Sequence, residues 1–134
     1  MIDENAINNN SIVAKLVFLE KKDSSKSILF TGDIEAKAED KLVSKYGDKL
    51  KSDILKVAHH GAETSSSNAF LEAVAPKIAL IGVGKDNSYG HPSESTIKNL
   101  KNIGAKIYRT DQNGEIEINL TKNNFKIKTY EYFF

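Results

Sequence analysis

The sequence contains no cysteine, and this absence excludes two kinds of structure. Without thiols the fold cannot be held by disulfides, and a metal cannot be bound by thiolates. The absence of cysteine does not indicate a cellular compartment, because a cysteine-free domain is stable in reducing and in oxidising surroundings alike. Any metal site in this chain must therefore use oxygen and nitrogen ligands.

Long apolar runs and a strong net charge are also missing. No run approaches the roughly 20 residues that span a bilayer, and residues 1–5 lack the blocks of a signal peptide. The net charge of +1 gives no overall attraction to nucleic acid or acidic membranes. Arg109 is the only arginine, and lysines dispersed among acids are more typical of a solvated surface than of a phosphate-binding track. Residues 1–134 are predicted to form one soluble domain with a real core.

Hydrophobic periodicity predicts alternating strands and helices in the order ββαβαβαβββ. The helices are expected at 35–46, before Pro76 with N-cap candidates at 65–68, and between Ser93 and Gly104. The first strand is expected to be buried on both faces, and the fourth to be central. This order indicates an α/β fold with a mixed, partly parallel sheet whose site lies at the carboxyl ends of its strands. The predicted strands are 11–20, 27–30, 53–58, 77–83, 106–110, 114–120 and 125–134.

Asp33 follows the second predicted strand in the segment FTGD and precedes a helix. An aspartate in this position is most often a helix N-cap. The other interpretation is a metal ligand, since Gly32 lets the backbone turn sharply and aim the carboxylate into a cleft.

His59 and His60 end the third predicted strand, immediately before Gly61. Adjacent side chains at a strand end point in opposite directions, so one imidazole can bind a metal while the other orients substrate or transfers a proton. Pairs of surface histidines also occur by chance, but a strand, two histidines and a glycine in succession favour function.

His91 is the last histidine of the chain and lies in the loop segment YGHP. It fits an exposed loop position and a functional position about equally well. Lys85 and Tyr89 lie in the same loop, where they would suit an anionic substrate or simply a polar surface.

Taken in order, these segments resemble the metallo-β-lactamase superfamily, and in particular its ComEC-like group of DNA-uptake hydrolases. The resemblance extends over about residues 8–119. The segments that carry it are NNNSIV at 8–13, FTGD at 30–33, LKVAHHGA at 55–62 with Thr64 and Ser65, APK at 75–77 and YGHP at 89–92.

The resemblance implies an αβ/βα sandwich with a two-metal site, usually zinc and alternatively manganese, that activates hydroxide for phosphoester hydrolysis. Asp33 would be the bridging aspartate and His59 a ligand. His60 would be its neighbour at the metal, and His60 and His91 would position substrate or assist proton transfer.

One departure from the family pattern limits these expectations. The main metal-binding element of the family is rich in histidine and lies in the N-terminal half of its fold, whereas no histidine precedes His59 here. The chain is therefore expected to be the C-terminal half of such a domain, inactive by itself and with weak or absent metal binding.

Two partners and two alternative roles follow from this interpretation. A homodimer or the missing N-terminal half would cover the sheet face left open, expected around Ile12, Leu16, Leu29, Ile54, Val57, Ile78 and Leu80. DNA or another phosphoester is the expected substrate. The alternatives are a non-catalytic module that binds nucleic acid or protein, with Lys98 and Lys101 as a basic helix face, and a fragment with no independent role.

Overall fold

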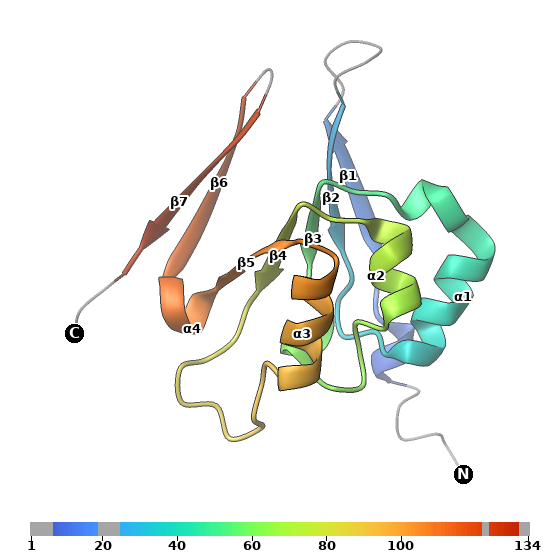
Figure 1. The fold of residues 1–134 in the computed structure, drawn as a ribbon, viewed down its shortest axis with the longest axis horizontal. Coiled ribbons are helices and arrows are strands. Elements are labelled where there is room, and N and C mark those ends of the chain that lie inside the picture. Colours follow the sequence, from blue (N-terminus) through green and yellow to red (C-terminus); the bar gives the residue numbers. More distant parts are fainter. Residues whose placement is uncertain (1–6, 19–24, 122–123, 132–134) are drawn as a thin grey trace.

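The centre of the fold is a five-stranded mixed sheet in the order β1-β2-β3-β4-β5 (Figure 1). The computed structural model of the chain describes residues 7–18, 25–121 and 124–131. β1 is antiparallel to β2, and β2 to β5 are parallel to one another, which confirms the predicted α/β class. The strands are β1 (Ala14–Phe18), β2 (Lys26–Phe30), β3 (Ile54–Lys56), β4 (Ile78–Ile81) and β5 (Lys106–Arg109).

Three helices connect the parallel strands, as the sequence predicted. They are α1 (Ala36–Tyr46), α2 (Asn68–Val74) and α3 (Glu94–Asn102). The Ser67 hydroxyl accepts from the Phe70 backbone N–H, and the Ser93 hydroxyl accepts from that of Thr96, so each serine caps its helix. Three 3-10 turns complete this part of the chain, η2 (Asn8–Asn10), η3 (Gly47–Leu50) and η4 (Ala58–Gly61).

The last two strands form a separate antiparallel pair, β6 (Glu115–Thr121) and β7 (Asn124–Tyr130). A short helix, α4 (Thr110–Asn113), stands where a turn was expected and leads from β5 into β6. The predicted ends of the first and last strands, at 19–20 and 132–134, lie outside the described residues.

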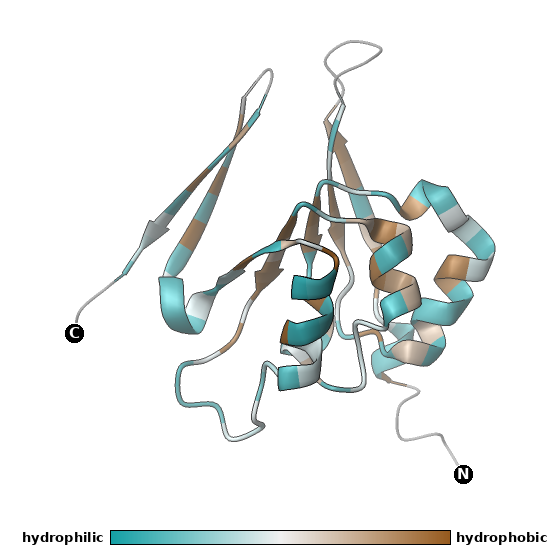
Figure 2. Cartoon of the chain, viewed as in Figure 1, coloured by the Kyte–Doolittle hydropathy of each residue, from teal (hydrophilic) through white to brown (hydrophobic). Residues whose placement is uncertain are grey.

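The core lies between one face of the sheet and the three connecting helices. Leu29, Leu55 and Ala79 are neighbours in register on this face, and all three are buried. They belong to one apolar cluster with Phe70 of α2 and Leu100 of α3, and the apolar sides of the helices face inward (Figure 2). Within the described residues, no helix combines the length and the apolar character needed to cross a membrane.

The prediction for the first strand was wrong. β1 is an edge strand, and all five of its residues are exposed, including Leu16 at 52%. Apolar composition identified a strand correctly, but it could not show whether a second layer covers that strand. The fourth strand was expected to be central. β4 is an inner strand, paired with β3 and β5, while β3 occupies the middle of the sheet.

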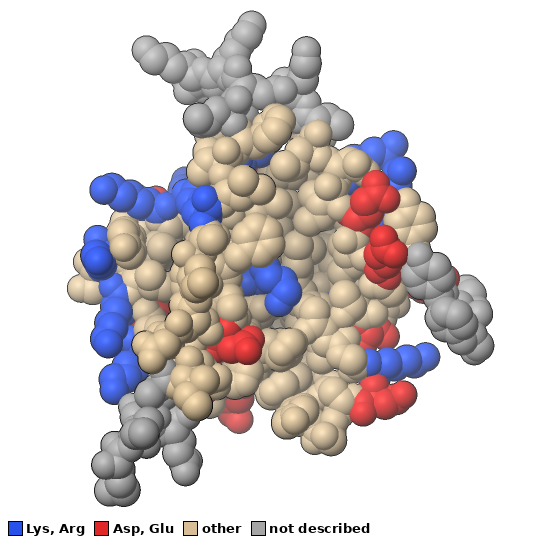
Figure 3. All heavy atoms as spheres, turned by 180° about the vertical axis from the view of Figure 1, so that it is seen from behind, with Lys and Arg blue, Asp and Glu red and all other residues tan. Residues whose placement is uncertain are grey.

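The face of the sheet away from these helices is only partly covered. Phe30 is 43% exposed there, and the back view shows a surface with few charged side chains apart from a basic and an acidic group near its centre (Figure 3). Ile54 of the same face is fully buried, and the Lys26 ammonium lies over the Phe125 ring, 5.6 Å from its centroid, so the β6–β7 hairpin reaches this side. The predicted list of open-face residues therefore needs correction, since Leu29 and Val57 lie in the helix-covered core.

Candidate functional site

Three loops meet at the carboxyl edge of the parallel strands. They follow β2 at 31–35, β3 at 57–61 and β4 at 82–92, and the strand ends are aligned in register. The backbone N–H of His59 donates to the Gly32 carbonyl at 3.1 Å, and the N–H of Ser93 donates to the Gly61 carbonyl at 2.9 Å. The three predicted segments thus share one edge, as the order of the elements implied.

The Asp33 loop is fixed by the tight turn at Gly32 and by a backbone hydrogen bond of Asp33. Gly32 has φ +55°, and a Cβ placed on it would lie 2.7 Å from the Cβ of Ser11, so only glycine fits this turn. The Asp33 N–H donates to the Ser11 hydroxyl at 3.1 Å. The N-cap position of α1 belongs to Glu35, so the alternative interpretation of Asp33 as the N-cap was wrong.

Lys56 is the charged neighbour of Asp33. Burial lowers the pKa of the Lys56 ammonium, and attraction to the Asp33 carboxylate opposes that shift. The ammonium also donates to the Val57 carbonyl at 3.1 Å. The Asp33 carboxylate is therefore near enough to attract a partly desolvated cation at the end of β3.

The histidine pair lies in a strained turn and not at the end of a regular strand. His59 and His60 have φ of 49° and 55°, the left-handed region that residues with a side chain seldom adopt. Gly61 continues the turn at φ +81°, and a Cβ there would lie 2.6 Å from the Cβ of Pro92. The expectation of opposite side-chain directions from strand alternation was thus based on the wrong local structure, although the two rings do have different partners.

Glu35 lies beside the His59 ring. Its Oε1 lies 3.5 Å from His59 Nδ1, too long for a strong hydrogen bond but close enough for attraction to the ring. Asn8 Nδ2 donates to the same oxygen at 3.2 Å. Among the described residues, Glu35 Oε2 and His59 Nδ1 are buried without a hydrogen-bond partner. The contact directs Nδ1 inward and leaves Nε2 on the opposite side of the ring.

Sequence reasoning missed Glu35 because it was assigned only to the start of a helix. Its spacing from Asp33 was the available signal. Two carboxylates two residues apart, directly after a buried strand, are placed to serve one strand-end site.

His60 is fixed by a different neighbour. Its Nδ1 lies 2.7 Å from the Gly82 carbonyl oxygen, at the end of β4. A carbonyl only accepts, so Nδ1 carries the proton in the neutral ring and Nε2 keeps its lone pair. His60 is exposed and lines a hollow of about 180 Å³ together with Asn87, Tyr89 and His91.

His91 is positioned by Asn87 and by two aromatic neighbours. The His91 N–H donates to Asn87 Oδ1 at 3.0 Å, and Asn87 Nδ2 donates back to the His91 carbonyl at 2.8 Å. The Tyr89 ring stacks on the His91 ring, with 5.8 Å between their centroids. The His59 ring meets the His91 ring edge-on, with 5.7 Å between their centroids. Burial lowers the pKa of His91, and the nearby His59 and His60 lower it further, so the ring is neutral at pH 7.

The donor set fits a metal ion only in part. The structure brings Glu35, His59 and His91 together and places Asp33 beside Lys56. Across residues 7–18, 25–121 and 124–131, no three side chains of histidine, cysteine, aspartate or glutamate are grouped closely enough to hold a metal. The ligand roles of Asp33, His59 and His60 remain predictions.

Two of the proteins to which the chain is similar carry names from the competence system. The chain is 38% identical over 110 residues to "Competence protein ComA" of Neisseria gonorrhoeae, and 36% identical over 110 residues to "ComE operon protein 3" of Bacillus subtilis. The chain is similar to part of a competence protein. These matches include 80% and 82% of this chain but only 16% and 13% of the two relatives, so the chain spans about a seventh of their length.

A third relative extends the similarity along more of the sequence. "Uncharacterized protein YcaI" of Escherichia coli is 34% identical over 122 residues, which include 91% of this chain and 16% of that protein. No family model matches the chain.

Proposed function

We propose that this chain is the C-terminal part of a metal-dependent hydrolase domain in a DNA-uptake protein, acting on phosphoester bonds when a second part completes the site. The observation that carries the proposal is the meeting of the three loops at one sheet edge, with His59 beside Glu35 and His60 fixed by Gly82. The similarity to competence proteins supports the setting.

In this proposal Asp33 and His59 hold a zinc ion, with His60 beside them and further ligands from another segment of the protein. When bound, the metal supplies an activated water or hydroxide for hydrolysis. His91 is neutral, and it is available to accept a proton or to position the substrate. Glu35 keeps the His59 ring in one orientation, as carboxylates beside metal-binding histidines commonly do.

The partly open sheet face gives the second part a place to pack. Leu16 and Phe30 are exposed on it, and half-buried Ile78 and Leu80 extend the same surface across β4. A second polypeptide layer or a second copy of the chain would remove these side chains from water.

Zinc calorimetry on the chain tests the ligand assignment. Wild type, His59→Ala and His60→Ala are titrated with zinc and then with manganese, and circular dichroism confirms that each variant is folded. We expect weak zinc binding that the His59 variant loses and the His60 variant partly keeps. Identical titrations for wild type and the His59 variant would refute the assignment.

Phosphodiesterase activity of the whole competence-type protein tests the reaction. Asp33→Asn keeps the size of the side chain and removes its charge, so we expect activity to fall by at least a hundredfold, the usual scale for a lost electrostatic contribution. Full activity in this variant would exclude Asp33 from the chemistry.

A non-catalytic binding module is the second candidate. Lys98 and Lys101 of α3 are exposed beside a hollow of about 490 Å³ that Arg109 also lines. If this candidate is right, α3 variants will lose partner binding while zinc has no measurable effect.

A further inference from the structure

A groove runs along the outer edge of the molecule, between the edge strand β1 on one side and α1, η3 and residues 51–53 on the other. It consists of three adjoining hollows of about 340, 200 and 330 Å³. The first two share Val13, Leu42 and Tyr46 as lining residues, and the last two share Lys15. The three hollows therefore follow one another along β1, with the Lys15 side chain between the second and the third.

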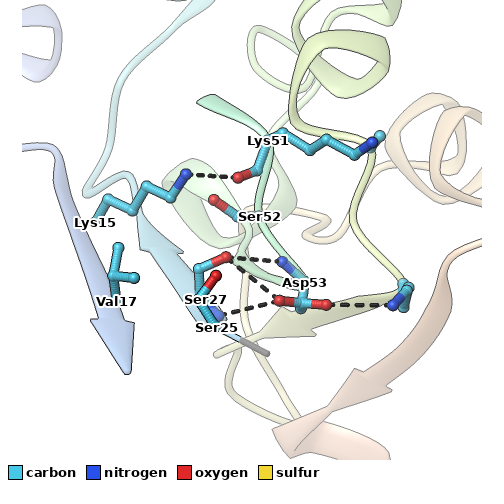
Figure 4. A pocket seen from close by; sticks show the side chains of 9 residues that line it. Lys15, Val17, Ser25, Ser27, Lys51, Ser52 and Asp53 are labelled. Carbon is cyan, nitrogen blue, oxygen red and sulfur yellow. Dashed lines mark hydrogen bonds and ion pairs between the residues drawn. The ribbon is translucent and has the colours of Figure 1, made fainter. Parts of the chain in front are cut away.

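One end of the groove adjoins the candidate site. Ser11 lines the first hollow, and the same side chain accepts the hydrogen bond from the Asp33 N–H. The other end lies at the opposite edge of the sheet, around Asp53 at the start of β3 (Figure 4). A chain-like ligand in the groove would thus be led toward the Asp33 loop.

The walls of the groove are basic. Among the described residues that line it, six are lysines and Asp53 is the one carboxylate; the lysines are Lys15, Lys41, Lys45, Lys49, Lys51 and Lys77. The back view shows basic side chains gathered along the edge on which α1 lies (Figure 3).

The single carboxylate does not cancel this charge. Asp53 accepts from the Ser27 N–H at 3.0 Å and pairs with the Lys77 ammonium at 3.3 Å. The Lys15 ammonium donates to the carbonyls of Lys49 and Lys51 at 2.9 and 2.6 Å, which leaves its charge uncompensated. The near-neutral total of the chain therefore conceals a surface with a strong local excess of positive charge.

An aromatic ring lies midway along the groove. Tyr46 ends α1, is 42% exposed and lines both of the first two hollows. The Lys45 ammonium lies 5.3 Å from the centroid of its ring. Exposed aromatic rings among lysines are how proteins bind single strands without sequence preference, because every base can stack on a ring.

We propose that this groove binds single-stranded DNA, with the phosphates along the lysines and a base stacked on Tyr46. The 11 residues of α1 give a wall about 16 Å long at 1.5 Å per residue, which matches about five stacked nucleotides at 3.4 Å each. The inference rests on the proposed function, because it names the substrate that reaches the Asp33 edge.

Fluorescence anisotropy with a labelled 12-nucleotide oligo-dT tests the proposal. The measurement is made in EDTA at several salt concentrations, so that neither metal nor hydrolysis contributes. With Lys41, Lys45, Lys49 and Lys51 neutralising about four phosphates, the logarithm of affinity should fall with the logarithm of salt at a slope of about −2.8. Lys45→Gln combined with Lys49→Gln should reduce the slope to about −1.4.

A matched pair of lysines on β7 provides the control. Lys126→Gln combined with Lys128→Gln removes the same charge from an exposed strand outside the groove, and it should leave the slope unchanged. Tyr46→Ala should weaken binding about tenfold, and Tyr46→Phe should bind as wild type does, because the ring is kept.

Several results would overturn the proposal: no salt-dependent binding, equal loss in the β7 control, or equal affinity for a duplex of the same length. Its failure is distinguishable from failure of the proposed function. Zinc binding that depends on His59 without binding of oligo-dT would reject only the groove, whereas oligo-dT binding without zinc binding would reject only the metal site.

Discussion

Glu39 is expected to be the most important polar side chain for the stability of this fold. It lies on α1, is fully buried, and accepts hydrogen bonds from the backbone N–H groups of Ser66 at 2.6 Å and Ser67 at 2.8 Å. These N–H groups belong to the start of α2, where no helical carbonyl can reach them. The carboxylate therefore joins two helices and holds the segment that follows the His59 turn.

Glu39→Ala should lower the free energy of unfolding by about 4 kcal/mol. The substitution leaves the buried Ser66 N–H and the partly buried Ser67 N–H without an acceptor, at roughly 1–3 kcal/mol each. Because domains of this size are stable by only about 5–15 kcal/mol, much of the fold's stability would be lost. Urea unfolding followed by circular dichroism measures the change. Glu72→Ala, an exposed site on α2, is the control and should change stability by less than about 0.5 kcal/mol.

A loss below about 1 kcal/mol for Glu39→Ala would contradict this reasoning. It would mean that other groups satisfy the N–H groups of Ser66 and Ser67 once the carboxylate is removed.

The pH dependence of the same site has a defined sign. Burial raises the pKa of the Glu39 carboxyl above its ordinary value of 4.5, and the hydrogen bonds from Ser67 and Ser66 oppose the shift. A raised pKa in the folded state favours folding below pH 4.5, and this contribution is lost as the pH rises through the folded-state value. Glu39→Gln has no carboxyl group to titrate, so wild type should lose stability relative to that variant as the pH rises above about 4.5. A gain of stability by wild type relative to the variant over the same range would show that the hydrogen bonds outweigh burial.

Two further predictions concern the site edge and the open face. Gly61→Ala should lower the free energy of unfolding by more than about 2 kcal/mol, because the new Cβ would lie 2.6 Å from the Cβ of Pro92. Gly104→Ala is the control in the same urea assay, because Gly104 has a similar positive φ with open space around it. Phe30→Ser should reduce self-association in analytical ultracentrifugation if a second copy packs on the open sheet face, and unchanged association would place any dimer elsewhere.

The sequence by itself determined the order of the elements and the edge of the sheet that carries the loops. Ser67 and Ser93 cap the helices they were expected to begin, because a cap depends on hydrogen bonds within one turn. The alternation of strands and helices required parallel pairing. Asp33, His59 and His91 therefore had to follow neighbouring strands that end at one edge.

Only the tertiary structure decided how those side chains are used and which surfaces are covered. Gly61, which continues the strained turn of His59 and His60, passes close to Pro92, and no local pattern encodes that contact. Glu35 reaches His59 across two loops, as Glu39 reaches Ser66 across two helices. The lysine groove combines β1, α1 and η3, and its charge is invisible in a total of +1. Burial of β1 was predicted wrongly for the same physical reason, since exposure depends on what packs against a strand as well as on what the strand contains.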